Sequence, residues 1–328
     1  MSELPDGLVE FVEGAGWGAA AVEPIPGDAS FRRYFRLRRA SGETAMLMHA
    51  PPPEEDPQPF ILVAGWLGAN GMRAPELLAQ NPREGWLLTE DFGNDRMREW
   101  VDANPADELP AYEAAIDALV ALHMRPAGPF SPYDLPTYLR EAALLTEWYA
   151  PAHGLDVDVA RYNAAWEKAL APLIDRQASP VTVLRDYHAE NIMLLDKKAT
   201  APQGLIDFQD ALVGHRAYDL VSLLQDARRD VSPELEEAML ARYIEQTGAD
   251  DDFRADYARL GAQRNAKIVG IFVRLFKRDE KPKYLTMIPR VWAAMERDLQ
   301  HPALEPVARW FDTNIPDGLR AAHGGNIA

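Results

Sequence analysis

Two short segments carry side chains whose types and spacing suit phosphoryl transfer from ATP. Residues 185–191 read RDYHAEN, and residues 206–208 read IDF. They give the order Asp186, four residues, Asn191, and then a short strand that ends at Asp207. Such a transfer needs a carboxylate that orients and deprotonates the attacking hydroxyl, together with oxygen ligands for Mg²⁺. We therefore interpret Asp186 as the catalytic base, and Asn191 and Asp207 as magnesium ligands.

The neighbouring sequence predicts the strands that position these side chains. Residues 181–184 form an apolar, largely β-branched run, which predicts a short buried strand leading to the base. Residues 191–195 predict the next strand, and a polar turn then leads into residues 204–206. Strands paired across that turn would hold Asn191 and Asp207 at neighbouring ends of one hairpin. The alternative is that both aspartates are ordinary turn residues, because Asp favours strand ends.

Composition narrows the class of protein. The chain has 328 residues, a net charge of −17 and no cysteine. The acidic surface argues against nucleic acid or an anionic membrane as a partner. The absence of cysteine excludes disulfides and thiolate metal sites and fits a reducing compartment. The first residues show no secretory signal, and no apolar run reaches membrane-spanning length. We expect a cytoplasmic protein with small-molecule partners and no obligate protein partner.

The order of predicted elements divides the chain into two parts. Residues 1–91 are rich in strands, and residues 92–328 are mostly helical. The predicted strands cover residues 20–25, 31–39, 44–49 and 84–90, and the predicted helices cover 8–15, 60–67, 112–123, 159–174, 218–227, 233–247, 253–276 and 287–299. This order predicts an α+β, two-lobed fold with a nucleotide-clamping N-terminal lobe and a larger catalytic and substrate-binding C-terminal lobe.

Residues 27–36, with the sequence GDASFRRYFR, lie between two predicted strands and form a candidate phosphate-covering loop. Small residues let backbone N–H groups approach phosphate oxygens. Alternation along the strand sends Arg32 and Arg33 to opposite faces, so one arginine set could reach a nucleotide. We interpret Ser30, Phe31, Arg32 and Arg33 as nucleotide-binding residues. A solvated basic edge strand is an equally good interpretation of the same pattern.

Residues 89–93, TEDFG, form the candidate joint between the lobes. Main-chain groups of Glu90 and Asp91, directly after a strand, could hydrogen-bond the edge of adenine. Gly93 would let the chain bend there. The alternative is a plain exit from a strand into a loop.

The motif at residues 185–191 and 206–208 resembles the aminoglycoside phosphotransferase and choline kinase superfamily, whose members are protein-kinase-like enzymes acting on small molecules. Residues 121–123 (ALH) and 218–220 (YDL) are similar to further landmarks of that group. The resemblance implies a protein-kinase-like fold, ATP as phosphoryl donor and Mg²⁺ as cofactor. It also implies that Asp219, which could cap a helix, steadies the catalytic loop.

Other segments resemble a narrower group, the anomeric sugar kinases of bacterial cell-wall recycling. They are residues 27–37, 263–272, 281–285 and 288–290. This resemblance implies phosphorylation of N-acetylmuramic acid and N-acetylglucosamine at the C1 hydroxyl, giving the sugar α-1-phosphate. An aminoglycoside, choline or another metabolite stays open as acceptor, because an acidic chain suits cationic acceptors.

The chain departs from the kinase pattern at one position. Kinases carry a Lys on the third strand that binds the α and β phosphates, but residues 44–49 read TAMLMH. An arginine from Arg32, Arg33 or Arg36 must then supply the charge. The same departure keeps open a nucleotide-binding regulator without turnover.

Three basic or titratable side chains are candidates for contact with the acceptor. His188 lies two residues after the predicted base, with a packing or turn-stabilising histidine as the alternative. Arg274 and Lys277 share one edge of a predicted helix and could face the lactyl carboxylate of a muramic acid. A solvated basic face near a helix C-terminus is the alternative for this pair.

Overall fold

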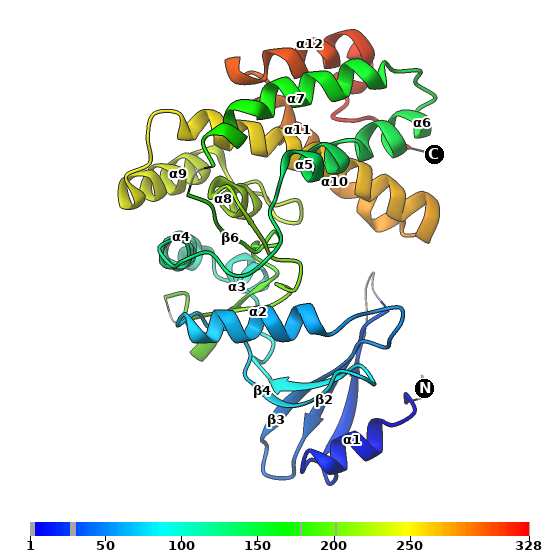
Figure 1. The fold of residues 1–328 in the computed structure, drawn as a ribbon, viewed down its shortest axis with the longest axis vertical. Helices are drawn as coiled ribbons and strands as arrows, with labels where there is room; N and C mark the ends of the chain where they lie inside the picture. Colours follow the sequence, from blue (N-terminus) through cyan, green and yellow to red (C-terminus); the bar gives the residue numbers. More distant parts are fainter. Residues whose placement is uncertain (1–3, 27–30, 178, 201, 328) are drawn as a thin grey trace. The chain divides into compact units, whose positions relative to one another are not determined.

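The structure is a computed structural model that describes residues 4–26, 31–177, 179–200 and 202–327. The chain forms two compact units (Figure 1). Unit 1 contains Met1–Trp100 and Asn191–Asp210, and unit 2 contains Val101–Glu190 and Ala211–Ala328. Unit 1 is therefore discontinuous in sequence, because the segment that carries Asn191 and Asp207 belongs to it. The functional division predicted after residue 91 stays a prediction.

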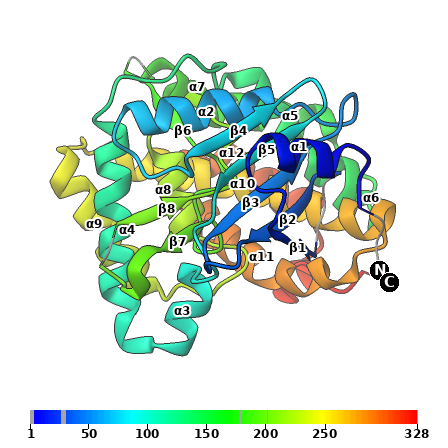
Figure 2. The same ribbon diagram turned by 90° about the horizontal axis from the view of Figure 1, so that it is seen from below.

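Unit 1 is built on an antiparallel five-stranded sheet with the order β1-β2-β3-β5-β4 (Figure 2). Its strands are β1 (Ala21–Ile25), β2 (Arg33–Arg38), β3 (Thr44–His49), β4 (Leu77–Asn81) and β5 (Trp86–Glu90). A separate antiparallel pair, β7 (Ile192–Leu194) and β8 (Gln203–Leu205), forms the hairpin predicted from the sequence. That prediction is confirmed.

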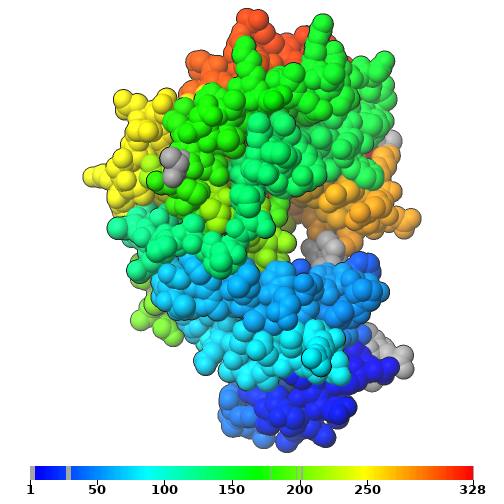
Figure 3. All heavy atoms as spheres, in the orientation of Figure 1, coloured from blue at the N-terminus to red at the C-terminus, as the bar shows by residue number. Residues whose placement is uncertain are grey.

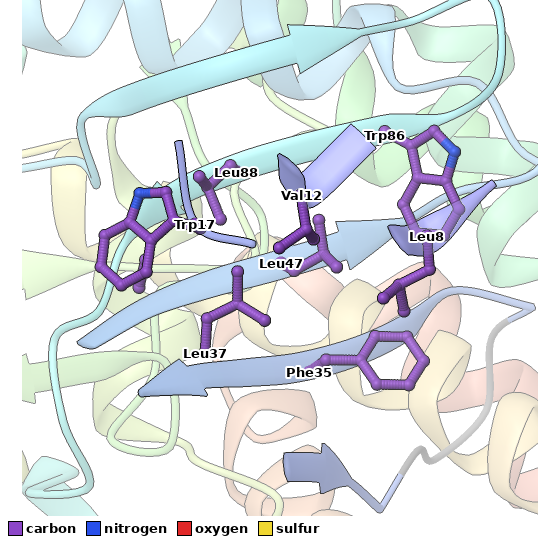
Figure 4. Close-up of a cluster of buried hydrophobic side chains, with 9 residues drawn as sticks. Leu8, Val12, Trp17, Phe35, Leu37, Leu47, Trp86 and Leu88 are labelled. Atoms are coloured by element: carbon purple, nitrogen blue, oxygen red, sulfur yellow. The ribbon is translucent and has the colours of Figure 1, made fainter. Parts of the chain in front are cut away.

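A helix packs on each face of the sheet. On one face, α1 (Leu8–Gly14) buries Leu8 and Val12, four residues apart and thus on one side of the helix. They meet Phe35, Leu37, Leu47, Trp86 and Leu88 from the strands (Figure 4). On the other face, α2 (Gln58–Ala69) places Phe60 and Ile61 against Met48 and Leu87. Part of α2 lies on the surface of unit 1 (Figure 3), and its Leu62 is an exposed hydrophobic side chain.

Unit 2 is mostly helical. The helix α3 (Met97–Ala103) begins in unit 1 and ends in unit 2. The other helices of unit 2 are α4 (Glu108–His123), α5 (Leu135–Ala142), α6 (Ala150–Ala152), α7 (Val159–Asp175), α8 (Ala217–Leu224), α9 (Pro233–Thr247), α10 (Phe253–Asp279), α11 (Ile288–Leu299), α12 (Glu305–Asn314) and α13 (Asp317–Ala321). The short 3₁₀ or π-helical turns of unit 2 are η1 (Pro105–Asp107), η2 (Leu145–Tyr149), η4 (Pro282–Met287) and η5 (Pro302–Leu304), and the 3₁₀ turn η3 (Leu195–Lys197) follows β7 in unit 1. The long helix α10 packs against α8 and α11. In a two-stranded pair, β6 (Val181–Val183) precedes and β9 (Leu212–Gly214) follows the stretch of chain that carries Asp186 and Asp207.

Most predicted elements are present, with corrections. The strands β4 and β9 and the helices α3, α5, α6, α12 and α13 were not predicted. The helix predicted over residues 218–227 ends at Leu224. It ends there because Gln225 leaves the helix, donates a hydrogen bond to Asp298 (3.1 Å) and accepts one from Asn265 (2.7 Å). Within the described ranges, none of the helices has the length and apolar content needed to cross a bilayer.

Candidate active site

The β7–β8 hairpin of unit 1 brings the two predicted metal ligands together. The Ile206 N–H donates to the Asn191 carbonyl oxygen at 3.1 Å. The Asn191 side-chain amide donates to Asp207 Oδ2 at 3.4 Å, and the Gln209 amide donates to Asp207 Oδ1 at 2.8 Å. The hairpin thus places the side-chain amide of Asn191 beside the carboxylate of Asp207, and each side chain carries an oxygen that could bind a metal ion. Both are oxygen ligands of the kind that Mg²⁺ prefers, so the residues fit this ion.

The backbone at Asp207 is also unusual. Its φ of 58° lies in the left-handed region, which costs a non-glycine residue about 1–2 kcal/mol, less for Asp. The next residue, Phe208, is buried, and its ring lies 5.0 Å from that of Phe60 on α2. Packing of Phe208 therefore fixes the turn that projects Asp207, whose side chain is exposed. Such strain is common at functional positions.

The metal pair is not part of a larger ligand cluster. Across the described ranges, no group of three or more His, Cys, Asp or Glu side chains is arranged to hold a metal ion. Mg²⁺ typically takes one or two protein carboxylates and completes its shell with water and substrate phosphates. The two side chains of Asn191 and Asp207 are consistent with this coordination preference.

In unit 2, a buried carboxylate holds the segment before the predicted base. Asp219, at the start of α8, accepts hydrogen bonds from the N–H groups of Leu184 (2.6 Å) and Arg185 (2.8 Å). Arg185 has a φ of 71°, so the chain turns sharply just before Asp186. Burial raises the pKa of Asp219 to about 7, although the two N–H donors oppose that rise. Asp219 therefore fixes the strand exit that presents Asp186.

Further contacts hold the rest of the loop. The Ser222 hydroxyl donates to the Arg185 carbonyl oxygen at 3.2 Å. The Tyr187 hydroxyl donates to the Ala115 carbonyl oxygen at 2.7 Å, and Asp226 accepts from the Ala189 N–H at 3.3 Å. Residues 184–190 are thus anchored by hydrogen bonds to α4, to α8 and to Asp226, which lies just after α8.

The structure favours the packing alternative for His188. Its side chain is only 2% exposed, and its Nε2 lies 3.0 Å from an Arg228 guanidinium nitrogen. Because arginine only donates, Nε2 acts as the acceptor. Burial lowers the pKa of His188 to about 3, which keeps the imidazole neutral. Arg228 also pairs with Glu190 at 2.9 Å, so His188 and Glu190 are tied to the same cation.

A second buried carboxylate, Glu141 on α5, was missed by sequence reasoning. It contacts Arg185 and lies 3.0 Å from Lys267 Nζ on α10. The Tyr133 hydroxyl also contacts Glu141. Burial opposes ionisation of Glu141, but the charges of Lys267 and Arg185 outweigh it and lower the pKa. No spacing signal links these positions, because α5 and the catalytic loop are more than forty residues apart.

The residues predicted to bind nucleotide are distributed over unit 1. Ser30 lies outside the described residues, and Phe31 is exposed. The side chain of Arg33 lies over the Phe35 ring at 5.3 Å. Arg32 is half-buried beside Glu55 at 3.1 Å.

The predicted joint is held by ion pairs. Glu90 binds Arg73, and Asp91 binds Arg36 at 2.6 Å. Gly93 has a φ of 82°, which provides the expected bend. A cavity of about 410 Å³ beside this segment is lined by Arg73, Phe92 and residues of β7 and the following turn.

Arg274 and Lys277 lie in the last turns of α10. Lys277 is exposed, with its ammonium 5.1 Å from the Phe276 ring centroid. Arg274 is half-buried, and its Nε is buried without a hydrogen-bond acceptor in the described part of the chain. Contact of these two cations with an acceptor stays a prediction.

The sequence matches one family over most of its length. Residues 21–261 match the family described as "Phosphotransferase enzyme family". A protein of Caulobacter vibrioides named N-acetylmuramate/N-acetylglucosamine kinase is 36% identical, over 96% of this chain and 98% of that protein. A protein of Pseudomonas aeruginosa with the same name is 35% identical, over 96% of this chain and 95% of that protein.

Solved structures share the fold at lower identity. The gentamicin complex of the aminoglycoside phosphotransferase APH(2")-IIa has a TM-score of 0.62 at 14% identity, covering 94% of this chain and 99% of that one. A choline/ethanolamine kinase family protein from Mesorhizobium loti has a TM-score of 0.58 at 14% identity, covering 94% of this chain and 100% of that one. The predicted protein-kinase-like α+β fold is confirmed.

The raised pKa of Asp219 predicts a pH dependence of stability. The folded protein holds a proton on Asp219 that the unfolded chain, with a pKa of about 4, releases. This contribution is fully present below about pH 4 and is lost as the pH rises towards 7. We expect the free energy of unfolding of the native protein, relative to Asp219→Asn, to fall between about pH 4 and 7 in urea titrations.

Asp117→Asn is the matched control. Arg242 lowers the pKa of Asp117, so its loss should give no decline across that window. A flat difference for Asp219→Asn would contradict the protonated state.

Proposed function

The chain belongs to the phosphotransferase enzyme family and, within it, groups with the N-acetylmuramate/N-acetylglucosamine kinases, and from this premise we propose a specific reaction. It is the ATP- and Mg²⁺-dependent phosphorylation of the anomeric C1 hydroxyl of N-acetylmuramic acid and N-acetylglucosamine. The product is the sugar α-1-phosphate, formed during recycling of bacterial cell wall.

The observation that carries this proposal is the agreement among four relatives. All four are named N-acetylmuramate/N-acetylglucosamine kinase, and their sequence identity to this chain ranges from 33% to 36%. The shortest of the four alignments still covers 80% of this chain. A shared activity is therefore the simplest explanation of a shared sequence over nearly the whole length.

Asp186 acts as the base in the proposed mechanism. Its carboxylate accepts the proton of the C1 hydroxyl as that oxygen forms a bond to the γ-phosphorus of ATP. The bond between the γ-phosphorus and the bridging oxygen breaks, and ADP leaves with the bonding electrons. An anomeric hydroxyl is more acidic than an ordinary alcohol, so a carboxylate is a sufficient base. Positioning and charge neutralisation supply most of the rate enhancement in such transfers.

Asn191 and Asp207 hold Mg²⁺ in this proposal, and the ion, when bound, neutralises charge on the phosphates. Phe31, Arg32 and Arg33, with Ser30 before them, are proposed to bind the nucleotide. The main chain at Glu90 and Asp91 is proposed to meet the adenine edge.

Contacts with the acceptor are assigned to cations of unit 2. N-acetylmuramic acid carries a lactyl carboxylate, which Arg274 and Lys277 are proposed to bind. His188 was also a candidate, but its burial and its contact with Arg228 support a part in shaping the loop. We propose that the reaction takes place in the cytoplasm, where ATP is available, with the amino sugar and ATP as its partners.

An acceptor panel tests the proposed function. The purified protein is incubated with Mg²⁺, ATP and one acceptor at a time: N-acetylmuramic acid, N-acetylglucosamine, an aminoglycoside or choline. Phosphorus NMR then identifies the ester by its coupling to the neighbouring proton. We expect an anomeric phosphate from the two amino sugars. A phosphate ester formed only on the aminoglycoside or choline would reject the proposed acceptor, and the absence of ADP with every acceptor would favour a regulator.

The base assignment predicts the effect of Asp186→Asn. The amide cannot accept the proton of the hydroxyl, so we expect kcat to fall by about 10²–10⁴-fold while calorimetry shows nearly unchanged ATP affinity. The exposed Asp251→Asn makes the same charge change far from the motif in sequence and should keep full activity. Full activity in Asp186→Asn would remove Asp186 from the base position.

A further inference from the structure

The α2-facing side of the sheet carries arginines where the third strand lacks a cation. Tyr34 pairs with Met48 and Arg36 with Met46 across β2 and β3. Tyr34 packs with the cluster that Met48 forms with α2 residues, and Arg32, Tyr34 and Arg36 alternate onto that same face. The methionines of β3 thus lie beside the arginine-bearing strand.

The side chain of Arg36 is hydrogen-bonded to the segment after β5. Its guanidinium donates to Asp91 Oδ1 at 2.9 Å, to the Gly93 carbonyl oxygen at 3.0 Å and to Asn94 Oδ1 at 2.8 Å. The side chains of Arg36 and Asp91 are largely buried. A guanidinium with three anchors on one loop stabilises that loop, and moving it to a phosphate would break all three.

Arg33 extends over the opposite face. Its guanidinium lies 5.3 Å from the ring of Phe35, which belongs to the core under α1. Burial lowers the pKa of His49, the cross-strand partner of Arg33, and the charge of Arg33 adds to that effect. The guanidinium of Arg33 therefore lies on the side of the sheet that α1 covers.

Arg32 differs from both neighbours in its surroundings. Its Nε lies 3.1 Å from Glu55 Oε2, and the two side chains are 17% and 16% exposed. Glu55 lies three residues before α2, the helix that follows β3. Arg32 is also hydrogen-bonded to the Tyr34 side chain.

The pKa of Arg32 depends in part on the charge of Asp207, the predicted metal ligand. Burial alone would lower the pKa of Arg32, but its interactions with Tyr34, Glu55 and Asp207 outweigh burial and raise the pKa. Burial raises the pKa of Tyr34, and the charges of Asp207 and Glu55 add to the rise, so the Tyr34 hydroxyl stays neutral. Arg32, Tyr34, Glu55 and Asp207 thus form one electrostatically coupled cluster inside unit 1, which we call the Arg32 cluster.

We propose that Arg32, positioned by Glu55, binds the phosphates of ATP in place of the lysine that kinases carry on the third strand. This inference rests on the proposed function in one respect, that ATP is the phosphoryl donor. It assigns Glu55 as a positioning residue and separates Arg32 from Arg33 and Arg36.

The Arg32–Glu55 pair joins a cation to a glutamate, as the lysine–glutamate ion pair of protein kinases does. In protein kinases, the third-strand Lys pairs with a Glu from the helix that follows. Here the carboxylate still comes from the approach to the helix after β3, and the cation comes from the approach to β2. A guanidinium has five N–H donors, so it can keep a carboxylate at Nε and bind phosphate oxygens through its other nitrogens.

Nucleotide binding without acceptor tests this proposal. Calorimetry in the presence of Mg²⁺ compares ATP, ADP and adenosine on the native protein and on Arg32→Ala. We expect ATP and ADP affinity to fall by about 10- to 100-fold, the effect of one charged hydrogen-bonding group, and adenosine affinity to change by less than about twofold. Arg32→Lys should recover part of the loss.

A matched ion pair at the far end of β2 serves as the control. Arg38 Nε lies 3.1 Å from Glu23 Oε1, the same pairing at the same distance, but on exposed side chains. Arg38→Ala should leave the affinities for all three ligands unchanged. Glu55→Gln should weaken ATP by about 3- to 10-fold with adenosine unaffected, because the guanidinium keeps its charge but loses its anchor.

Two results would overturn the proposal. One is ATP affinity within about twofold of the native value in a folded Arg32→Ala protein; the other is an equal loss for adenosine and ATP, which would mark a merely structural ion pair. Arg32→Gln removes the charge but keeps a polar side chain and its aliphatic stem, and it is read by the same criteria if the alanine variant does not fold. Because no acceptor is present, failure of the sugar-kinase proposal leaves this result standing, and the two failures are distinguishable.

Discussion

The hydrogen-bonded pairing of Asn191 with Asp207 is the constraint on which the rest of the account depends. A three-residue ladder between β7 and β8 sets it, because Ile192 pairs with Leu205 and Asn191 then lies opposite Ile206, the residue directly before Asp207. Packing of Phe208 on Phe60 and a left-handed backbone at Asp207 complete the turn. Without this hairpin, the amide and the carboxylate would have no fixed relation, and a metal-bound triphosphate would have no defined seat in unit 1.

Buried carboxylates organise the loop that carries the proposed base. Asp219 and Asp226 accept backbone N–H groups on both sides of the loop that carries Asp186, and Glu141 holds the arginine directly before it. Each is buried, so each depends on its partners for compensation. The acidity of the chain, with a net charge of −17, is thus partly structural.

Sequence patterns predicted the features that depend on local spacing. The hairpin of residues 191–206 followed from two apolar runs with a polar turn, and strand alternation separated Arg32 from Arg33 correctly. Partners distant in sequence could not be found this way. Glu55 is 23 residues from Arg32, and Glu141 is 44 residues from Arg185; neither position differs from an ordinary surface acid in its neighbourhood. The early end of α8 was missed for the same reason, because Gln225 is drawn from the helix by Asn265 and Asp298 of other helices.

The most direct test of the Asn191–Asp207 site is ATP calorimetry on the native protein and on Asp207→Ala, each with and without Mg²⁺. The account predicts that Mg²⁺ strengthens ATP binding to the native protein, and that this gain disappears in the variant because its metal carboxylate is gone. The exposed Asp210→Ala, three residues later in the chain, should keep the gain. An undiminished Mg²⁺ effect in Asp207→Ala would contradict the account at its centre.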